Sequence, residues 1–194
     1  MRGLGVALLL LLALAGRAAA QDHRLAERLD ATTAAAVQRV VDSAAHEGLP
    51  TEPLIQKALE GGTLGASGDR IVYAVGALHG QLGRARQALG ARASEADLTA
   101  AAGALRAGVS PASLQRLQSL RGDRPLVVPI AVLTDLVADG VSPDEATRSV
   151  LDLAREGRPD EEFMALRAGR DGPAATEPGG RPPLRPAADP PVDR

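Results

Sequence analysis

The feature that most constrains this fold is a short turn that recurs three times between stretches of helical periodicity. It reads Gly48-Leu49-Pro50-Thr51, Gly108-Val109-Ser110-Pro111 and Gly140-Val141-Ser142-Pro143. A glycine can close a helix in the left-handed conformation, and the apolar residue after it packs back on the last turn. In the second and third turns, Ser110 and Ser142 then cap the next helix, and Pro111 and Pro143 fit its first position, where no amide N–H is needed. Each turn therefore predicts two helices that are joined directly.

Between these turns, apolar residues recur at steps of three and four, which is the spacing of one helix face. In the first predicted helix this stripe runs through residues 25–44. Residues 126–133 are apolar enough for a buried strand, but the continuation of the pattern to Val137 favours a buried helix. The other predicted helices span residues 51–60, 69–89, 94–107, 110–120, 125–139, 142–156 and 159–168.

These elements predict an all-α fold, an irregular multi-helix bundle of about eight helices with tight Gly-x-Ser-Pro connections. The turns at Gly108 and Gly140 are 32 residues apart, and the turn at Gly48 lies 60 residues before Gly108. That spacing also fits a short α-solenoid of degenerate helix pairs. The sequence outside the turns repeats poorly, so the bundle is the prediction and the solenoid is the alternative.

Two glycine-rich stretches have separate interpretations. Residues 61–68 read Gly-Gly-Thr-Leu-Gly-Ala-Ser-Gly. They lack the lysine of a phosphate-binding loop, so we expect a flexible linker between helices. Gly76, Gly80 and Gly83 share a helix with His79. We expect this face of small residues to permit close approach of another helix.

The two ends of the chain differ in composition from the part between them. Residues 1–20 have a charged start, an apolar run at 4–15 and small residues before Gln21, which is the order of a cleavable signal peptide. The apolar run has 12 residues, whereas a membrane-spanning helix needs about 20. Residues 170–194 are rich in proline and glycine and predict a disordered tail. Residues 21–169 are then one helical domain, periplasmic or secreted, with no transmembrane segment after cleavage.

Composition excludes several classes of function. Removing residues 1–20 removes two arginines and no acid, so the net charge falls from −2 to −4, which gives no broad nucleic-acid footprint. The chain has no cysteine, so disulfides and thiolate metal sites are excluded. No nucleophile elbow, zinc-protease, P-loop or calcium-loop spacing is present. We therefore assign no catalytic residue, no metal ligand and no cofactor.

The aromatic residues and histidines offer little for a binding or catalytic site. Tyr73 and Phe163 are the only aromatics, which disfavours binding of sugars or bases by stacking. We expect Tyr73 to be a core or boundary residue with its hydroxyl at the surface. His23, His46 and His79 do not pair at helical spacing, and His46 fits a helix-end role.

Charge is the one feature of the sequence that points to a partner. Residues 84–124 carry a net charge of +4, and residues 135–162 carry a net charge of −6. Such segments usually form a solvated surface on which opposite charges meet within one molecule. The sharper hypothesis is a surface for an anionic partner, such as a lipid headgroup or an acidic protein. Its candidate residues are Arg84, Arg86, Arg92, Arg106, Arg116, Arg121 and Arg124.

Three function classes follow, in order of preference. The first is an exported, non-enzymatic interaction or scaffold module of the bacterial envelope, whose partner is another envelope protein or an anionic surface. The second is a helical carrier that binds a small apolar ligand between its helices. The third is a hydrolase, because acids are numerous; however, they cluster at predicted helix starts, where the helix dipole alone favours them.

Overall fold

The described part of the chain is built from helices and the turns between them. A computed structural model of the protein describes residues 23–171, and within this range no residue lies in a strand. The predicted all-α, multi-helix bundle is confirmed, and residues 126–133 contribute to a helix rather than a strand. After a helical segment at residues 23–28 come α2 (Ala31–His46), α3 (Glu52–Thr63), α4 (Gly68–Leu89), α5 (Glu95–Arg106), α6 (Pro111–Arg121), α7 (Val127–Ala138), α8 (Pro143–Arg155) and α9 (Asp160–Asp171).

The predicted terminal segments fall largely outside these residues. The predicted signal peptide, 1–20, lies wholly outside the described range, as do residues 172–194 of the predicted tail. The last helix extends further than its apolar spacing indicated. It was predicted at 159–168, whereas α9 continues to Asp171 and so takes in the first two residues of the range assigned to the tail.

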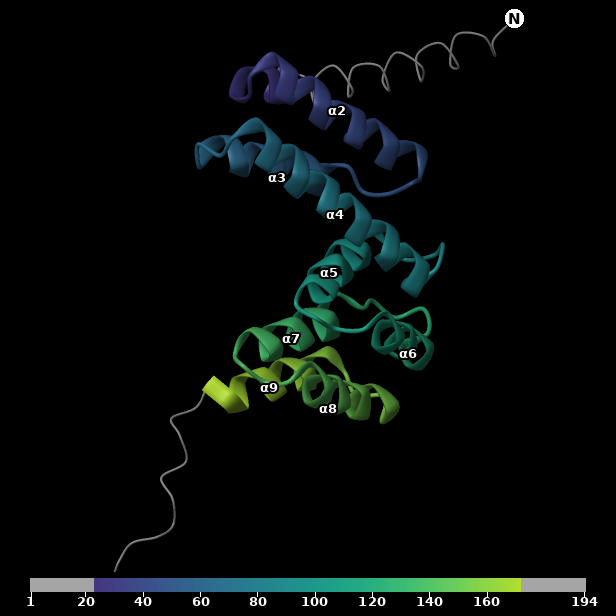
Figure 1. Cartoon of the computed structure of the whole chain (residues 1–194). Coiled ribbons are helices and arrows are strands. Elements are labelled where there is room, and N and C mark those ends of the chain that lie inside the picture. The colour runs from purple at the N-terminus through teal and green to yellow at the C-terminus, as the bar shows by residue number, and fades with distance from the viewer. Residues whose placement is uncertain (1–22, 172–194) are drawn as a thin grey trace, which may run out of the picture.

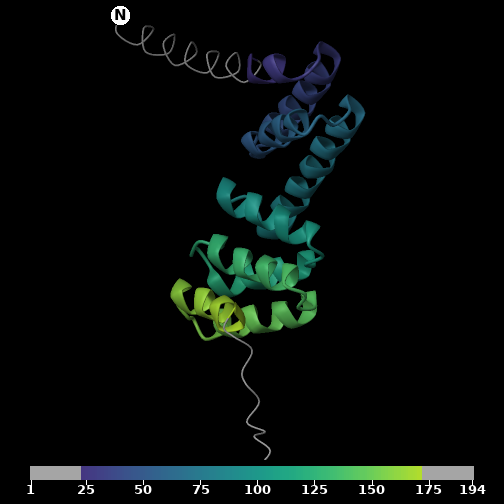
Figure 2. The ribbon, with the colours of Figure 1, turned by 90° about the vertical axis from the view of Figure 1, so that its left-hand side faces the viewer.

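The helices stack along one direction, with α2 and α3 at one end and α8 and α9 at the other (Figure 1). Each helix packs mainly on the next helix in the chain or on the one after it. From α4 onward the stack has two rows: α4, α6 and α8 form one, and α5, α7 and α9 form the other. The view turned by 90° shows the same elongated stack (Figure 2). Contacts between near neighbours are also what the solenoid alternative predicts. The helices of this bundle therefore share that feature with a solenoid.

The helices α2 and α4, which pack on each other, run in the same direction. The start of α4 lies against the start of α2. The approach is so close that a Cβ added at Gly68 would collide with the Thr33 side chain. Near the other end, His79 of α4 pairs with Glu47, which caps α2. The two helices therefore lie side by side and parallel for about three turns.

The predicted turn chemistry is present at the helix ends. At Gly140, with φ of 90°, the Gly140 amide donates to the Val137 carbonyl and the Val141 amide donates to the Leu136 carbonyl, at 3.1 and 3.0 Å. This double closure is the Schellman motif. Ser142 then caps α8 by accepting a hydrogen bond from the Glu145 amide. The same backbone closure occurs at Gly48, Gly65, Gly108, Gly140 and Gly157.

The first predicted helix is interrupted, which corrects the reading of residues 25–44 as one element. The break falls at Asp30, whose carboxylate accepts hydrogen bonds from the amides of Thr32 and Thr33, each at 3.0 Å. A carboxylate that satisfies two free amides is a strong helix start. The apolar spacing continues through the break, so periodicity alone did not reveal it.

The expected flexible linker at residues 61–68 is also wrong. Gly61 and Gly62 lie inside α3, which ends at Thr63, and Gly65 closes it with the Schellman pair of hydrogen bonds. A Cβ on Gly62 would lie 2.8 Å from Leu29 Cδ2 and 3.2 Å from the Arg28 carbonyl oxygen. Gly62 therefore allows α3 to approach the segment before α2, Gly61 lies close to Ile71 of α4, and the connection to α4 is a tight turn.

Candidate functional site

Three of the seven candidate arginines make contacts that join different parts of the molecule. Arg121 is 5% exposed, which contradicts its assignment to a partner surface. Its guanidinium pairs with the Asp160 carboxylate at 2.6 Å and donates to the Pro125 carbonyl at 2.9 Å. It also lies 5.2 Å from the centre of the Phe163 ring, a cation–π distance. Arg121 therefore links the end of α6 to α9.

Arg86 and Arg124 have similar structural contacts, although both keep some exposure. Arg86 donates to the Gly48 carbonyl at 2.7 Å and to the Ala91 carbonyl at 2.9 Å, so it joins α4 to two turns. Arg124 donates to the Gly157 carbonyl at 3.2 Å, across to the turn before α9. These carbonyls belong to helix ends, where arginine side chains commonly satisfy free acceptors.

The four other candidates are exposed and come from different elements. Arg84 lies on α4, Arg92 in the turn between α4 and α5, and Arg116 on α6. Arg106 lies near the end of α5, where its charge adds to a lowering of the pKa of Glu60 that is caused first by a hydrogen bond from Lys57. No contact brings the four guanidinium groups together, and they remain candidates only as separate surface charges.

Several acids of the segment at residues 135–162 also form ion pairs with arginines of the same molecule. Asp160 pairs with Arg121, and Asp135 pairs with Arg167 of α9 at 2.8 Å. Arg158 pairs with both Glu156 and Glu162, which raises the pKa of the guanidinium, first through the Glu156 hydrogen bond. The ordinary interpretation of the charge asymmetry, opposite charges meeting within one molecule, describes these contacts.

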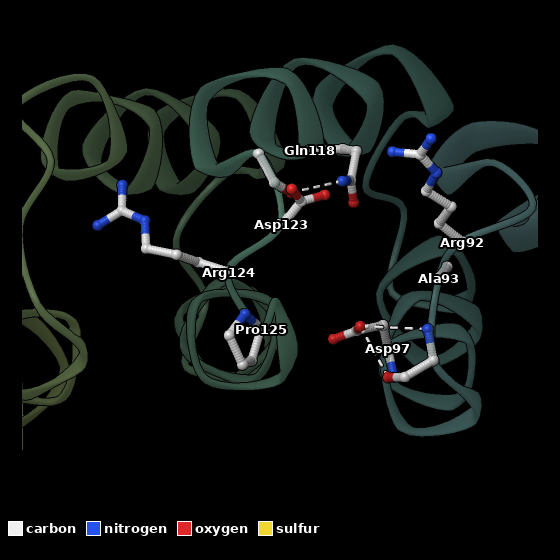
Figure 3. Close-up of a pocket in the computed structure, with 9 residues that line it drawn as sticks. Arg92, Ala93, Asp97, Gln118, Asp123, Arg124 and Pro125 are labelled. Atoms are coloured by element: carbon white, nitrogen blue, oxygen red, sulfur yellow. Dashed lines mark hydrogen bonds between the residues drawn. The ribbon is translucent and has the colours of Figure 1, made fainter.

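A polar cleft of about 230 Å³ lies between the turn before α5 and the end of α6. Its one deeply buried acid is already engaged: Asp97 accepts from the Leu126 amide at 2.8 Å and from the Ser94 hydroxyl at 2.7 Å. Figure 3 shows Arg92 and Arg124 on opposite sides of the cleft, with the Arg124 guanidinium directed away from it. The cleft therefore presents no cluster of groups aimed at one point.

A different surface, a groove between α2 and α4, has the apolar lining that binding sites commonly show. The groove has a volume of about 370 Å³. Its apolar surface comes from side chains that are only partly buried, although they continue the helical stripes that form the core. It is lined by Ala36, Arg39, Val40, Ser43, Val72, Gly76 and His79, and below we call this set the α2–α4 groove.

Tyr73 lies on α4 next to Val72, which lines this groove, and its 80% exposure shows that its expected place at a core boundary is wrong. The expected role of Gly76, Gly80 and Gly83 is wrong as well. A Cβ added at any of the three would meet no atom within 4 Å, so no helix of the described chain approaches them closely. The face of α4 around Tyr73 is therefore open and carries small side chains.

The polar residues of the groove are arranged asymmetrically. On one side, His79 Nε2 lies 3.1 Å from Glu47 Oε1, which also accepts a hydrogen bond from the Ser43 hydroxyl at 2.9 Å. On the other side, the Arg39 guanidinium makes one long hydrogen bond, from Nε to the Ala35 carbonyl at 3.4 Å. Arg39 therefore leaves most of its donors to solvent.

The remaining sequence expectations concern metals, membranes and His46. Among residues 23–171 no group of three or more histidine or acidic side chains could hold a metal ion. Within the same range no helix is both long and apolar enough to cross a bilayer. His46 lies in the last turn of α2, where Nδ1 donates to the Asp42 carbonyl at 2.8 Å, as expected for a helix-end residue.

Comparison with family models, with curated proteins and with solved structures finds no match for this chain. The site is therefore defined by its own residues.

The sequence contained a signal for the α2–α4 groove that its interpretation missed. Ala36 and Val40 were counted with Val37 and Val41 in one apolar stripe, which made the stripe wider than a single packed face requires. In the structure Val37 and Val41 are buried, whereas Ala36 and Val40 remain partly exposed at the edge. An over-wide stripe followed by a lone tyrosine on α4 was the available sign of a second apolar surface.

Proposed function

We propose that this chain is an exported, non-enzymatic interaction module of the bacterial envelope that binds another protein through the α2–α4 groove and Tyr73. The observation that carries the proposal is the 80% exposure of Tyr73 beside an open apolar groove of about 370 Å³. Tyrosine and arginine are among the residues enriched at binding hot spots, and this surface offers Tyr73 together with Arg39.

The shape of the molecule supports an interaction module more than a carrier of small apolar ligands. The pockets described range from about 170 to 370 Å³ and are open at the surface. A carrier buries most of its ligand's surface, which calls for an enclosed cavity. An elongated stack of helices instead offers an extended surface to a large partner. The export part of the proposal rests on the signal-peptide pattern of residues 1–20.

Native mass spectrometry of the protein isolated gently from its own host tests this function. We expect a complex heavier than the chain by the mass of a second protein, and we expect Tyr73→Ala to abolish it without unfolding the chain. The mass of the chain itself should correspond to a start at Gln21. A bound species of only a few hundred daltons would support the carrier instead, and an unliganded chain would contradict the interaction module.

A further inference from the structure

The chemistry of the α2–α4 groove indicates what kind of partner it accepts. The groove is lined along α2 from Ala36 to Ser43 and along α4 from Val72 to His79, seven residue steps on each helix. At 1.5 Å per residue the groove is about 10 Å long. This length matches two turns of a third helix, which would present three side chains at helical spacing to the floor.

The floor of the groove is apolar and has room for a close approach. Val40 and Val72 supply aliphatic surface from the two helices, and Gly76 between them has no side chain. No described atom lies within 4 Å of the place that a Gly76 Cβ would occupy. An apolar side chain seated there would cover the two valines, and Tyr73 follows Val72 directly on the same helix.

The charges at the edge of the groove are unevenly paired. The residues that line it include two that can carry positive charge, Arg39 and His79, and no acid. His79 already faces Glu47. Arg39 pairs with no acid of the described chain, and its one hydrogen bond is to a backbone carbonyl. A partner therefore gains most by placing a carboxylate opposite Arg39.

The same asymmetry disfavours a second copy of this chain as the occupant. In a two-fold dimer the same surface meets itself, so the groove of one copy would face the groove of the other. Arg39 would then meet a lining that contains cations and no unpaired acid. Like charges brought together across an interface weaken binding.

We propose that the α2–α4 groove binds an acidic amphipathic helix of a partner protein, with its apolar side chains on Val40, Val72 and Gly76 and a carboxylate on Arg39. This inference rests on the proposed function, because it names the partner chemistry of the same surface. The mode is a helix laid into a groove between two parallel helices.

Site-specific photo-crosslinking in the protein's own host tests the inference on the full chain. p-Benzoylphenylalanine replaces Tyr73, whose 80% exposure makes the exchange compatible with folding. A control carries the same photoreactive residue in place of Gln115, an exposed position on α6. We expect one adduct at the first position and none at the second. Mass spectrometry of the crosslinked peptide should identify a segment whose apolar residues recur at steps of three and four, with Asp or Glu at the edge of that stripe.

Two variants then probe the groove itself. Gly76→Gln fills it with a side chain that enters open space, and it also replaces a mid-helix glycine by a better helix former. Arg39→Glu reverses the charge at the edge. Each should lower the adduct yield about tenfold, the effect of roughly one lost favourable charge or packing contact. Gly103→Gln, at another open glycine on α5, and Arg148→Glu, on α8, are the matched controls and should leave the yield unchanged.

The outcomes separate the inference from the proposed function. Absence of an adduct at position 73 above the Gln115 control overturns the proposed function and the inference with it. An adduct with a second copy, with a segment that lacks acids, or with a yield indifferent to Arg39→Glu overturns the inference alone. Restoration of the Arg39→Glu adduct by an arginine in place of the partner's acid supports it, since only a direct charge contact is rescued by such an exchange.

Discussion

The two ends of the stack differ in where they place charged and apolar side chains. At the C-terminal end, charged residues hold helices together: Arg121 is buried against Asp160 and Phe163, and Arg167 pairs with Asp135. At the N-terminal end, apolar residues face outward, with Tyr73 exposed beside the α2–α4 groove. A buried arginine thus joins helices at one end, and the most exposed large apolar side chain of the described residues, that of Tyr73, lies nearer the other end.

This difference teaches where to look for a partner surface in a chain of this kind. A count of charges along the sequence singled out residues 84–124, but Arg86, Arg121 and Arg124 of that segment serve helix contacts. An exposed aromatic residue next to other open apolar surface, such as Tyr73 after Val72 of the groove, forms a wider patch of the kind that marks an interaction site. The outward-facing tyrosine is therefore better guidance to a binding surface than the net charge of a segment.

The largest expected effect concerns Arg121 at the C-terminal end. Arg121→Ala removes a charge-assisted hydrogen bond to Asp160, the bond to the Pro125 carbonyl and the contact with Phe163. We expect a loss of about 3 kcal/mol in the free energy of unfolding, measured by urea denaturation. The Asp160 side chain keeps 34% exposure, so water solvates part of its unpaired charge and limits the loss.

Arg116→Ala is the matched control, since Arg116 is an exposed arginine on the same helix. It should change the free energy of unfolding by less than about 0.5 kcal/mol. If the two substitutions changed the free energy of unfolding equally, Arg121 would contribute no more to stability than an exposed arginine does. The comparison between the two ends would then fail.

The second effect tests how closely α2 and α4 approach at their starts. A Cβ on Gly68 would collide with Thr33 Oγ1, which cannot move freely because it donates a hydrogen bond of 2.6 Å to Asp30. We expect Gly68→Ala to destabilise the protein by about 2 kcal/mol, the range of an overpacked contact. Thermal and urea unfolding measure it. An unchanged stability would show that the two helices are not in contact there.

Local features of this fold could be predicted from the sequence, because they depend on neighbours in the chain. The closure at Gly140 and the cap at Ser142 involve residues within a few positions, and both are present. The placement of Gly62 could not be predicted in the same way. It depends on Leu29 and the Arg28 carbonyl, more than 30 positions earlier, which only the packing of α3 brings close.

The candidate site was less predictable than the fold, for the same physical reason. Whether an arginine is a surface charge or an internal link depends on what packs around it, and Arg121 meets Asp160 across 39 positions of sequence. Tyr73 is the converse case, since nothing in the described part of the chain covers it. Periodicity indicates that a helix has an apolar face, but it does not fix how much of that face the other helices cover.

A third and smaller effect has the opposite sign and lies further along α4. Gly76 occupies a helix interior with open space around its Cβ position, so Gly76→Ala should gain helix propensity without a clash. We expect stabilisation by about 0.5–1 kcal/mol in urea denaturation. Together with Gly68→Ala, it measures the two ends of one interface: closed at the start of α4 and open where the groove lies. Destabilisation by Gly76→Ala would mean that another part of the chain fills the groove.

The smallest effect concerns pH and the one charged cap that starts α2. The hydrogen bond from the Thr33 hydroxyl, followed by those from the amides of Thr33 and Thr32, lowers the pKa of the Asp30 carboxyl below its ordinary value. The folded state therefore binds this proton less readily than the unfolded state. The stabilisation is fully present above the unfolded pKa of about 3.9 and is lost as the pH falls through the folded pKa.

Thr33→Val isolates this contribution, because it keeps the shape of a buried side chain and removes the hydroxyl. At pH 7 the variant should be less stable than the parent chain in urea denaturation. The gap should narrow as the pH falls below about 4, since the proton that binds Asp30 weakens it as an acceptor in the parent chain. A gap that stays constant from pH 7 to pH 3 would mean that the hydroxyl contributes through packing alone. The charge of Asp30 would then contribute nothing through this hydroxyl to the stability of the N-terminal end, and the difference from Arg121 at the other end would be larger.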